Sequence, residues 1–88
     1  MPSVHLHYWA GARAVAGTAE EQVEARTVRQ ALELAAASRG AQFTRVVAAC
    51  SLLVDGLALH PDDLDRALTG PVRVEVLPPF AGGQLNGG

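Results

Sequence analysis

The chain has 88 residues and a formal net charge of −2, with 49% hydrophobic and 18% charged residues. This composition fits one small domain and excludes disorder as the dominant state. The slightly acidic balance argues against a nucleic-acid binder with a basic face. All seven basic residues are Arg, which excludes Schiff-base chemistry and a phosphate-loop lysine. The single Cys excludes an internal disulfide framework and a Cys-rich zinc site.

The expected compartment is the cytoplasm. No apolar run approaches the roughly 20 residues that a membrane helix needs. The first residues lack the charged and then apolar layout of a secretory signal peptide. We therefore expect neither a membrane nor a nucleic acid as a partner.

The first quarter of the chain predicts a β-hairpin. Residues 4–9 (Val-His-Leu-His-Tyr-Trp) alternate with a period of two, which is typical of a strand with one face on the core. An Ala-rich connection over residues 10–17 follows, with room for a single helical turn. Residues 22–25 predict the second, antiparallel strand.

A helix follows the hairpin. Thr27 is the expected N-cap of a helix from about Val28 to Ser38, because Gln30 occupies the position of a capping box. Gly40 is the expected stop. Residues 43–47 predict a further helical turn or an irregular crossing.

The second half of the chain predicts three strands. Residues 49–54 and 57–59 are joined by the turn signal Asp-Gly at 55–56, which favours a hairpin. Residues 72–77 alternate strictly and stop at Pro-Pro, because proline cannot extend a ladder of hydrogen bonds. If this last strand pairs beside the first, the sheet is mixed and the helix covers one face. The predicted fold is therefore an α+β β-grasp with about five strands and one main helix.

The predicted domain spans residues 1–79, and residues 80–88 are expected to form a flexible tail with four Gly in nine positions. The strand alternation divides the side chains between two faces. The side chains expected to face the helix are Val4, Leu6, Tyr8, Val72, Val74 and Val76. Those expected to face outward are His5, His7, Trp9, Arg73, Glu75 and Leu77. An outward Trp9 beside Leu77 would be an apolar patch near the root of the tail, and such patches often mark partner interfaces.

Three segments resemble one family. Residues 76–83 (Val-Leu-Pro-Pro-Phe-Ala-Gly-Gly) are similar to the end of the MoaD group of ubiquitin-like sulfur carriers, the small subunits of molybdopterin synthase and their relatives. Residues 8–17 resemble the first strand and the connection after it in that group, and residues 50–56 resemble its central hairpin. Two departures stand out. Five residues follow Gly83, whereas the family stops at Gly-Gly, and residues 69–71 replace a Gly-Asp turn.

The resemblance implies a carrier without catalytic side chains of its own. In the family, the C-terminal glycine is adenylated by an E1-like enzyme of the MoeB or ThiF type, which uses ATP, and is then converted to a thiocarboxylate. The large synthase subunit, of the MoaE type, consumes the sulfur for the molybdenum cofactor. The resemblance also implies partner contacts at Trp9 and Leu77, with Leu59 as a weaker third position. No bound cofactor is implied.

Two glycines compete for the activated position. Gly83 matches the family spacing and requires a processing protease to remove residues 84–88. Gly88 would be used directly on a longer tether, since the extension also ends in Gly-Gly, at Gly87 and Gly88. Phe80, Ala81 and Gly82 complete the tail that a partner channel would receive. A Gly-Gly end suits such a channel because glycine has no Cβ.

Other interpretations stay open. The sulfur could serve cysteine, thiazole or secondary-metabolite synthesis, or the domain could be a ubiquitin-like interaction module that is never activated. His5 and His7 could be two metal ligands, but no third ligand is evident nearby, so we expect no metal site. Cys50 shares the inward parity of Leu52 and Val54, which favours a buried structural thiol.

Overall fold

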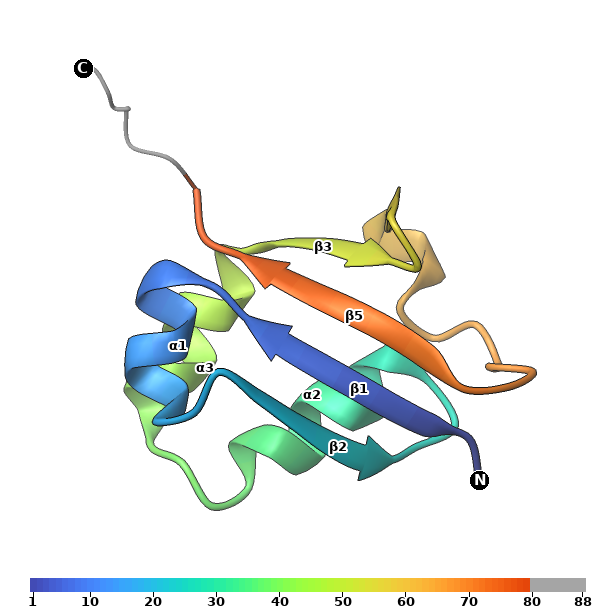
Figure 1. Cartoon of the computed structure of the whole chain (residues 1–88), viewed down its shortest axis with the longest axis horizontal. Coiled ribbons are helices and arrows are strands. Elements are labelled where there is room, and N and C mark those ends of the chain that lie inside the picture. Colours follow the sequence, from blue (N-terminus) through green and yellow to red (C-terminus); the bar gives the residue numbers. More distant parts are fainter. Residues whose placement is uncertain (80–88) are drawn as a thin grey trace.

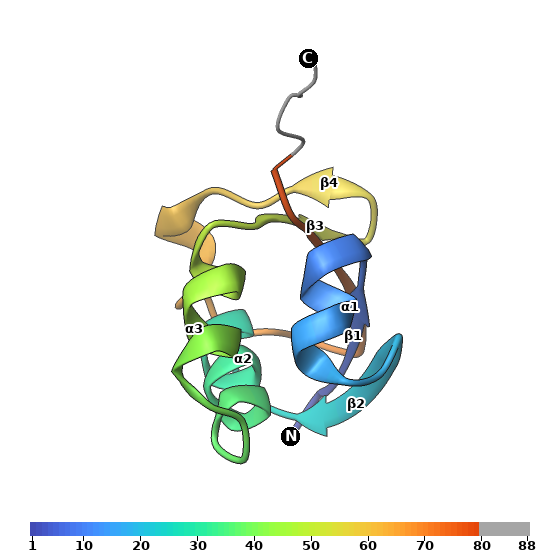
Figure 2. The same cartoon turned by 90° about the vertical axis from the view of Figure 1, so that its left-hand side faces the viewer.

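In a computed structural model, which describes residues 1–79, one mixed sheet is covered on one face by three helices (Figures 1 and 2). The elements in chain order are β1 (Ser3–Tyr8), α1 (Ala10–Ala16), β2 (Glu20–Glu24), α2 (Val28–Ala36), α3 (Ala41–Ala48), β3 (Ser51–Val54), β4 (Leu57–Ala58), a 3₁₀ turn η1 (Pro61–Asp63) and β5 (Val72–Leu77). The strand order is β2-β1-β5-β3-β4. Strands β1 and β5 run parallel at the centre, and the other neighbours are antiparallel. This is the β-grasp arrangement that the sequence predicts.

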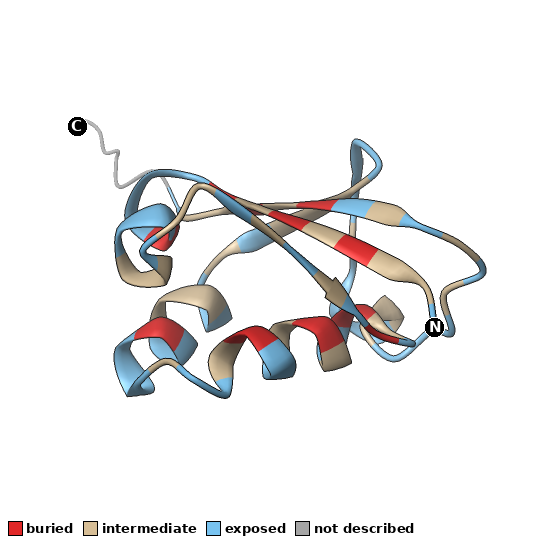
Figure 3. Cartoon of the chain, turned by 60° about the horizontal axis from the view of Figure 1, so that its bottom comes forward, coloured by how far each residue is buried: buried red, intermediate tan, exposed pale blue. Residues whose placement is uncertain are grey.

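The core lies between the sheet and the helices (Figure 3). On β1 the buried side chains are Val4, Leu6 and Tyr8, and on β5 they are Val74 and Val76. The parallel register pairs Leu6 with Val74 and Tyr8 with Val76, so the two central strands present one continuous apolar surface to the helices. The predicted inward parity is therefore confirmed, except that Val72 at the start of β5 is only half-buried.

The helical content is larger than predicted. The connection after β1 forms α1 over seven residues instead of a single turn, and Ala12 buries its side chain in the core. Residues 41–48 form α3, which lies beside α1 and buries Phe43 (Figure 2). One main helix was therefore an incomplete description, because α1 and α3 are nearly as long as the nine-residue α2. Burial of Ala12 and Phe43 in the core explains why the helical content is larger than predicted, because local helix propensity does not include the contribution of burial.

The predicted start of α2 is confirmed. The Thr27 hydroxyl accepts a hydrogen bond of 3.0 Å from the backbone N–H of Gln30. The Gln30 side chain reaches back and accepts a bond of 2.6 Å from the backbone N–H of Arg26, one residue before the cap. Helix α2 ends at Ala36, two positions before the predicted Ser38.

The second hairpin turns at the predicted Asp-Gly pair. Asp55 and Gly56 have φ angles of 49° and 87°, and two successive positive φ values define the type I′ turn that suits a two-residue hairpin. The Asp55 carboxylate accepts a hydrogen bond of 3.0 Å from the backbone N–H of Arg73, which ties the turn to β5. Strands β3 and β4 are shorter than the ranges predicted for them.

A half-buried arginine joins three elements on the helix side. Arg39 donates hydrogen bonds to the carbonyl oxygens of Ala16 (3.0 Å) and Ala35 (2.7 Å) and to the carboxylate of Glu21 (2.7 Å). Its guanidinium carbon lies 5.0 Å from the centroid of the Phe43 ring. The hydroxyl of Tyr8 donates to the same Glu21 carboxylate. The pKa of Tyr8 is raised, mainly by burial of the side chain and to a smaller extent by this hydrogen bond. These contacts connect α1, α2 and β2 around the end of β1.

Candidate docking face at the root of the tail

The sheet face opposite the helices carries the predicted outward side chains. We call this surface, formed by His5, His7, Trp9, Arg73, Glu75 and Leu77, the outer face. The register of β1 and β5 places His7 directly beside Glu75, and His5 beside Arg73. The outer face therefore combines polar side chains with Trp9 and Leu77, both at the end of the sheet where β5 stops.

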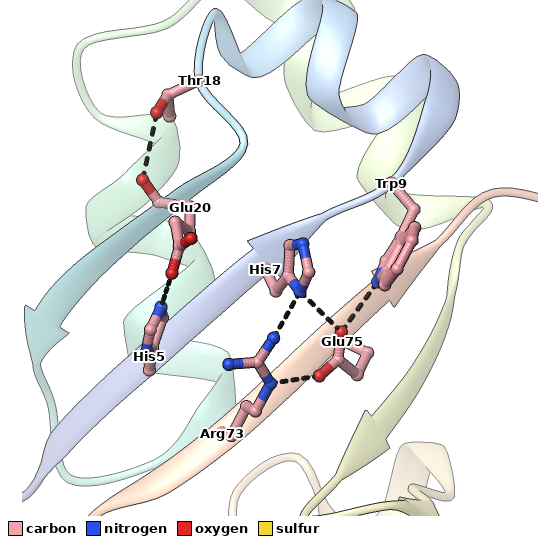
Figure 4. Close-up of polar contacts among 7 residues, drawn as sticks. All are labelled: His5, His7, Trp9, Thr18, Glu20, Arg73 and Glu75. Carbon is pink, nitrogen blue, oxygen red and sulfur yellow. Dashed lines mark hydrogen bonds and ion pairs between the residues drawn. The ribbon is translucent and has the colours of Figure 1, made fainter.

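Glu75 is the centre of a polar cluster on the outer face (Figure 4). Its Oε1 atom accepts a hydrogen bond of 2.7 Å from the indole Nε1–H of Trp9 and lies 3.0 Å from Nδ1 of His7. Its Oε2 atom accepts from Nε–H of Arg73, and Arg73 also contacts Nδ1 of His7. Burial alone would raise the pKa of Glu75, but the hydrogen bonds from Trp9 and Arg73 outweigh it and lower the pKa. Both carboxylate oxygens of Glu75 are therefore engaged.

Trp9 stays accessible although it is held in place. Its side chain is 45% exposed, and its ring centroid lies 4.5 Å from that of His7. The backbone N–H of Trp9 donates to the carbonyl of Val76 (3.1 Å), which fixes the residue beside the end of β5. Trp9 is also the N-cap residue of α1, directly before the first helical residue. The predicted outward orientation of Trp9 is confirmed.

Leu77 is the last residue of β5 and pairs with Ser51 of β3. It is half-buried and shares the parity of Glu75. Pro78 and Pro79 follow it and are the last residues that the structure describes. The predicted tail residues lie outside the described part of the chain: Phe80, Ala81, Gly82, Gly83, Gly87 and Gly88.

The third predicted contact, Leu59, lies elsewhere. It packs against the core and lines a groove of about 660 Å³ on the helix side, bounded by α2, α3, β3 and η1. In the hairpin formed by β3 and β4, the exposed leucine is Leu57, which is 75% exposed. The structure therefore brings Trp9 and Leu77 together at one end of the sheet, whereas Leu59 lies on a different surface. The role of Leu59 as a partner contact stays a prediction.

The two strand histidines are each paired with a carboxylate. His5 contacts Glu20 of β2, and His7 contacts Glu75 of β5 (Figure 4). Within residues 1–79, no group of three or more His, Cys, Asp or Glu side chains is placed to hold a metal ion.

Within the same residues 1–79, no helix has the length and apolar character needed to cross a membrane.

Cys50 lies just before β3 and is half-buried, less deeply than predicted. Its thiol donates a hydrogen bond of 3.1 Å to the carbonyl of Val46, and burial raises the pKa of the thiol. A raised pKa lowers the thiolate fraction and with it the reactivity. These properties fit a structural thiol.

The role of Glu75 is not predicted by the sequence. Alternation placed it on the same face as Trp9, His7 and Arg73, but gave no sign that one carboxylate contacts all three. A signal was present in the strand pairing, since a parallel β1–β5 register sets Glu75 beside His7. The cluster neutralises charge locally and leaves Trp9 and Leu77 as the apolar part of the surface, which can dock a partner without leaving a buried charge unpaired.

Comparisons with known proteins agree with this geometry. Residues 6–83 match the ThiS family. The subunit 1 of a putative molybdopterin converting factor from Pyrococcus furiosus is 25% identical, with a TM-score of 0.74 over 91% of this chain and 100% of that one. The small archaeal modifier protein 1 of Methanosarcina acetivorans has the same fold at 22% identity, with a TM-score of 0.78 over 94% of this chain and 98% of that one.

A third similar structure is a protein–protein complex. It contains subunits 1 and 2 of the molybdopterin-converting factor of Helicobacter pylori, and the matched chain is 14% identical with a TM-score of 0.64 over 92% of this chain and 99% of that one. Among curated proteins, no match was found. Because the family match runs from Leu6 in β1 through every later helix and strand to Gly83, the chain belongs to the ThiS family and has its ubiquitin-like β-grasp fold.

Proposed function

We propose that the protein is a sulfur carrier whose C-terminal glycine is adenylated and converted to a thiocarboxylate, which donates sulfur for molybdopterin synthesis. The observation that most directly supports this function is that the ThiS match continues past β5 to Gly83, through Pro78-Pro79-Phe80-Ala81-Gly82-Gly83. A match limited to the domain would support the fold alone. Its extension through the Gly-Gly pair supports the use of that segment.

The chemistry needs little from the carrier itself. The carboxylate oxygen attacks the α-phosphorus of ATP, pyrophosphate leaves, and an acyl adenylate forms. A sulfide then attacks the carbonyl carbon, the bond to AMP breaks, and the thiocarboxylate remains. Activation is required because an unmodified carboxylate has no good leaving group. The partner enzyme supplies ATP and the catalytic groups, so the carrier provides a reactive end and a docking surface. Since adenylation consumes ATP, the proposal places the protein in the cytoplasm.

Two partners follow from this proposal. The first is an E1-like adenylating enzyme of the MoeB or ThiF type, and the second is a large synthase subunit of the MoaE type. The Helicobacter pylori complex, which pairs subunit 1 with subunit 2 of the molybdopterin-converting factor, supports the second partner. The outer face around Trp9 and Leu77 is the proposed contact, because it lies at the end of β5 from which the tail leaves.

We assign the activated carboxylate to Gly83, with residues 84–88 removed by a protease. The end of the family match at Gly83 supports this assignment. The alternative uses Gly88 directly.

Intact mass spectrometry tests the function and the position together. The full chain and a chain ending at Gly83 are each incubated with the adenylating enzyme from the same genome, ATP and sulfide. We expect the chain ending at Gly83 to gain the mass difference between sulfur and oxygen. Gain by the full chain, with its last five residues intact, would instead assign Gly88. A Gly83→Ala variant of the short chain is the matched control and should react poorly.

If neither chain gains sulfur while the enzyme activates another substrate, the carrier function is wrong. The ubiquitin-like interaction module would then be the better description. The client pathway is tested separately by adding the large synthase subunit and the molybdopterin precursor. Failure at this second stage, after thiocarboxylate has formed, would indicate a carrier for another sulfur-requiring pathway.

A further inference from the structure

We propose that Glu75 is a positioning residue of the docking face, which holds the Trp9 indole in a fixed orientation for contact with the adenylating enzyme. The inference rests on the proposed function, because it assumes that Trp9 is a partner contact. It adds a residue that is neither apolar nor part of the tail.

An exposed tryptophan at the end of a strand has few packing constraints. Trp9 is 45% exposed and follows the last residue of β1, so packing covers only part of its ring. Two contacts restrict it, namely the hydrogen bond of 2.7 Å to Glu75 and the ring contact at 4.5 Å with His7. Only the first is strongly directional, since a carboxylate accepting from an indole N–H defines the rotation of the ring.

Glu75 can impose this orientation because its own side chain is fixed. Its carboxylate is 17% exposed, and Arg73 and His7 contact it from β5 and β1. Arg73 engages Oε2, which leaves Oε1 directed at Trp9 and His7. The indole is therefore held by an anchored group and not by another mobile side chain (Figure 4). A side chain ordered before binding loses less conformational entropy when the partner arrives.

The competing interpretation is that the cluster only stabilises the sheet. Pairing between β1 and β5 is already secured by their backbone register and by buried valine and leucine side chains. Under the competing interpretation, loss of Glu75 would lower stability and leave the mobility of Trp9 unchanged. Under the positioning role, the mobility of Trp9 and the affinity for the partner change together.

The first experiment measures Trp9 directly. Trp9 is the single tryptophan of the chain, so the decay of fluorescence anisotropy reports its motion without labelling. In Glu75→Ala we expect a new fast component on the nanosecond scale. Glu75→Gln should show less of it, because the amide oxygen can still accept from the indole. Glu33→Gln, on the exposed side of α2, is the control and should match the unmodified protein. An unchanged decay in Glu75→Ala overturns the proposal.

The second experiment measures affinity for the adenylating enzyme by calorimetry at constant pH. We expect Glu75→Ala to bind about five- to tenfold more weakly, and Glu75→Gln about twofold, from the added ordering cost. If Trp9→Ala weakens binding but Glu75→Ala does not, the docking face stands and the positioning role is wrong. If neither affects binding, the positioning role also falls. Sulfur uptake by the full chain or by the chain ending at Gly83 decides the carrier function independently of either result.

Discussion

The guanidinium of Arg39 lies 2.7 Å from the carboxylate of Glu21, joining the segment after α2 to an edge strand 18 positions earlier. Two backbone carbonyls, those of Ala16 and Ala35, accept from the same guanidinium. Each is close to the end of a helix, where carbonyls have no partner within the helix. Arg39 thus satisfies two helix ends and one carboxylate at once.

Arg39→Ala should therefore lower the free energy of unfolding by about 2 kcal/mol, because several half-buried hydrogen bonds are lost together. Arg39→Lys should recover little of it, since an ammonium lacks the planar fork of donors. Urea titration followed by circular dichroism measures both. Arg45→Ala, on the exposed surface of α3, is the matched control and should change stability by about 0.5 kcal/mol or less. Equal effects at Arg39 and Arg45 would contradict the role given to Arg39.

Trp9→Ala should reduce partner affinity far more than stability. We expect a loss of about 1 kcal/mol or less in the free energy of unfolding, because the side chain is exposed and loses one hydrogen bond to a surface cluster. Leu6→Ala, which empties a fully buried site in the preceding strand β1, should cost about 3 kcal/mol. Denaturation and calorimetry on the same preparations separate the two effects. A stability loss at Trp9 as large as that at Leu6 would show that Trp9 belongs to the core.

The pH dependence of stability should reveal the ionised state of Glu75. The pKa of Glu75 in the folded protein lies below its ordinary value of 4.5. Between these two values the unfolded chain binds more protons, so this contribution is present above pH 4.5 and is lost as the pH falls through the folded pKa. The stability difference between the unmodified protein and Glu75→Gln should therefore shrink on acidification. Denaturant titrations across this range measure it, and a difference that grows towards acid pH would contradict the hydrogen-bonded geometry.

Cys50 should react slowly with alkylating reagents in the folded protein. Burial raises the pKa of the Cys50 thiol, and the thiol donates a hydrogen bond to the Val46 carbonyl, so little thiolate is present near neutral pH. Mass spectrometry after timed exposure to iodoacetamide measures the rate, with the chain unfolded in urea as the control for full reactivity. Equal rates in the folded and unfolded chain would show that the thiol is accessible and unprotected.

Local patterns predicted much of the fold because the deciding interactions are themselves local. The alternation of Val4, Leu6 and Tyr8 set the buried face, the Thr27 cap set the start of α2, and Asp55-Gly56 set the second turn. Helix α1 was underestimated because its Ala-rich sequence is compatible with several conformations, and the burial of Ala12 against distant residues decides between them.

The contacts that could not be predicted join residues far apart in the chain. Nothing near Arg39 indicates Glu21, and nothing near Trp9 indicates Glu75, which is 66 positions away. Strand parity placed Trp9, His7, Arg73 and Glu75 on one face. The choice of Glu75 as their common partner depends on rotamers and register that only the assembled sheet defines.

The central position of β5 has a consequence for synthesis of the protein. Strand β1 is made first and its parallel neighbour β5 last among the described strands, yet they adjoin in the middle of the sheet. A nascent or prematurely terminated chain lacking β5 leaves the buried faces of β1 and β3 without the strand between them. It also lacks Arg73, Glu75 and Leu77, and therefore half of the outer face. Only a chain made through Leu77 can complete the centre of the sheet, so under the proposed function only such a chain would be presented to an activating enzyme.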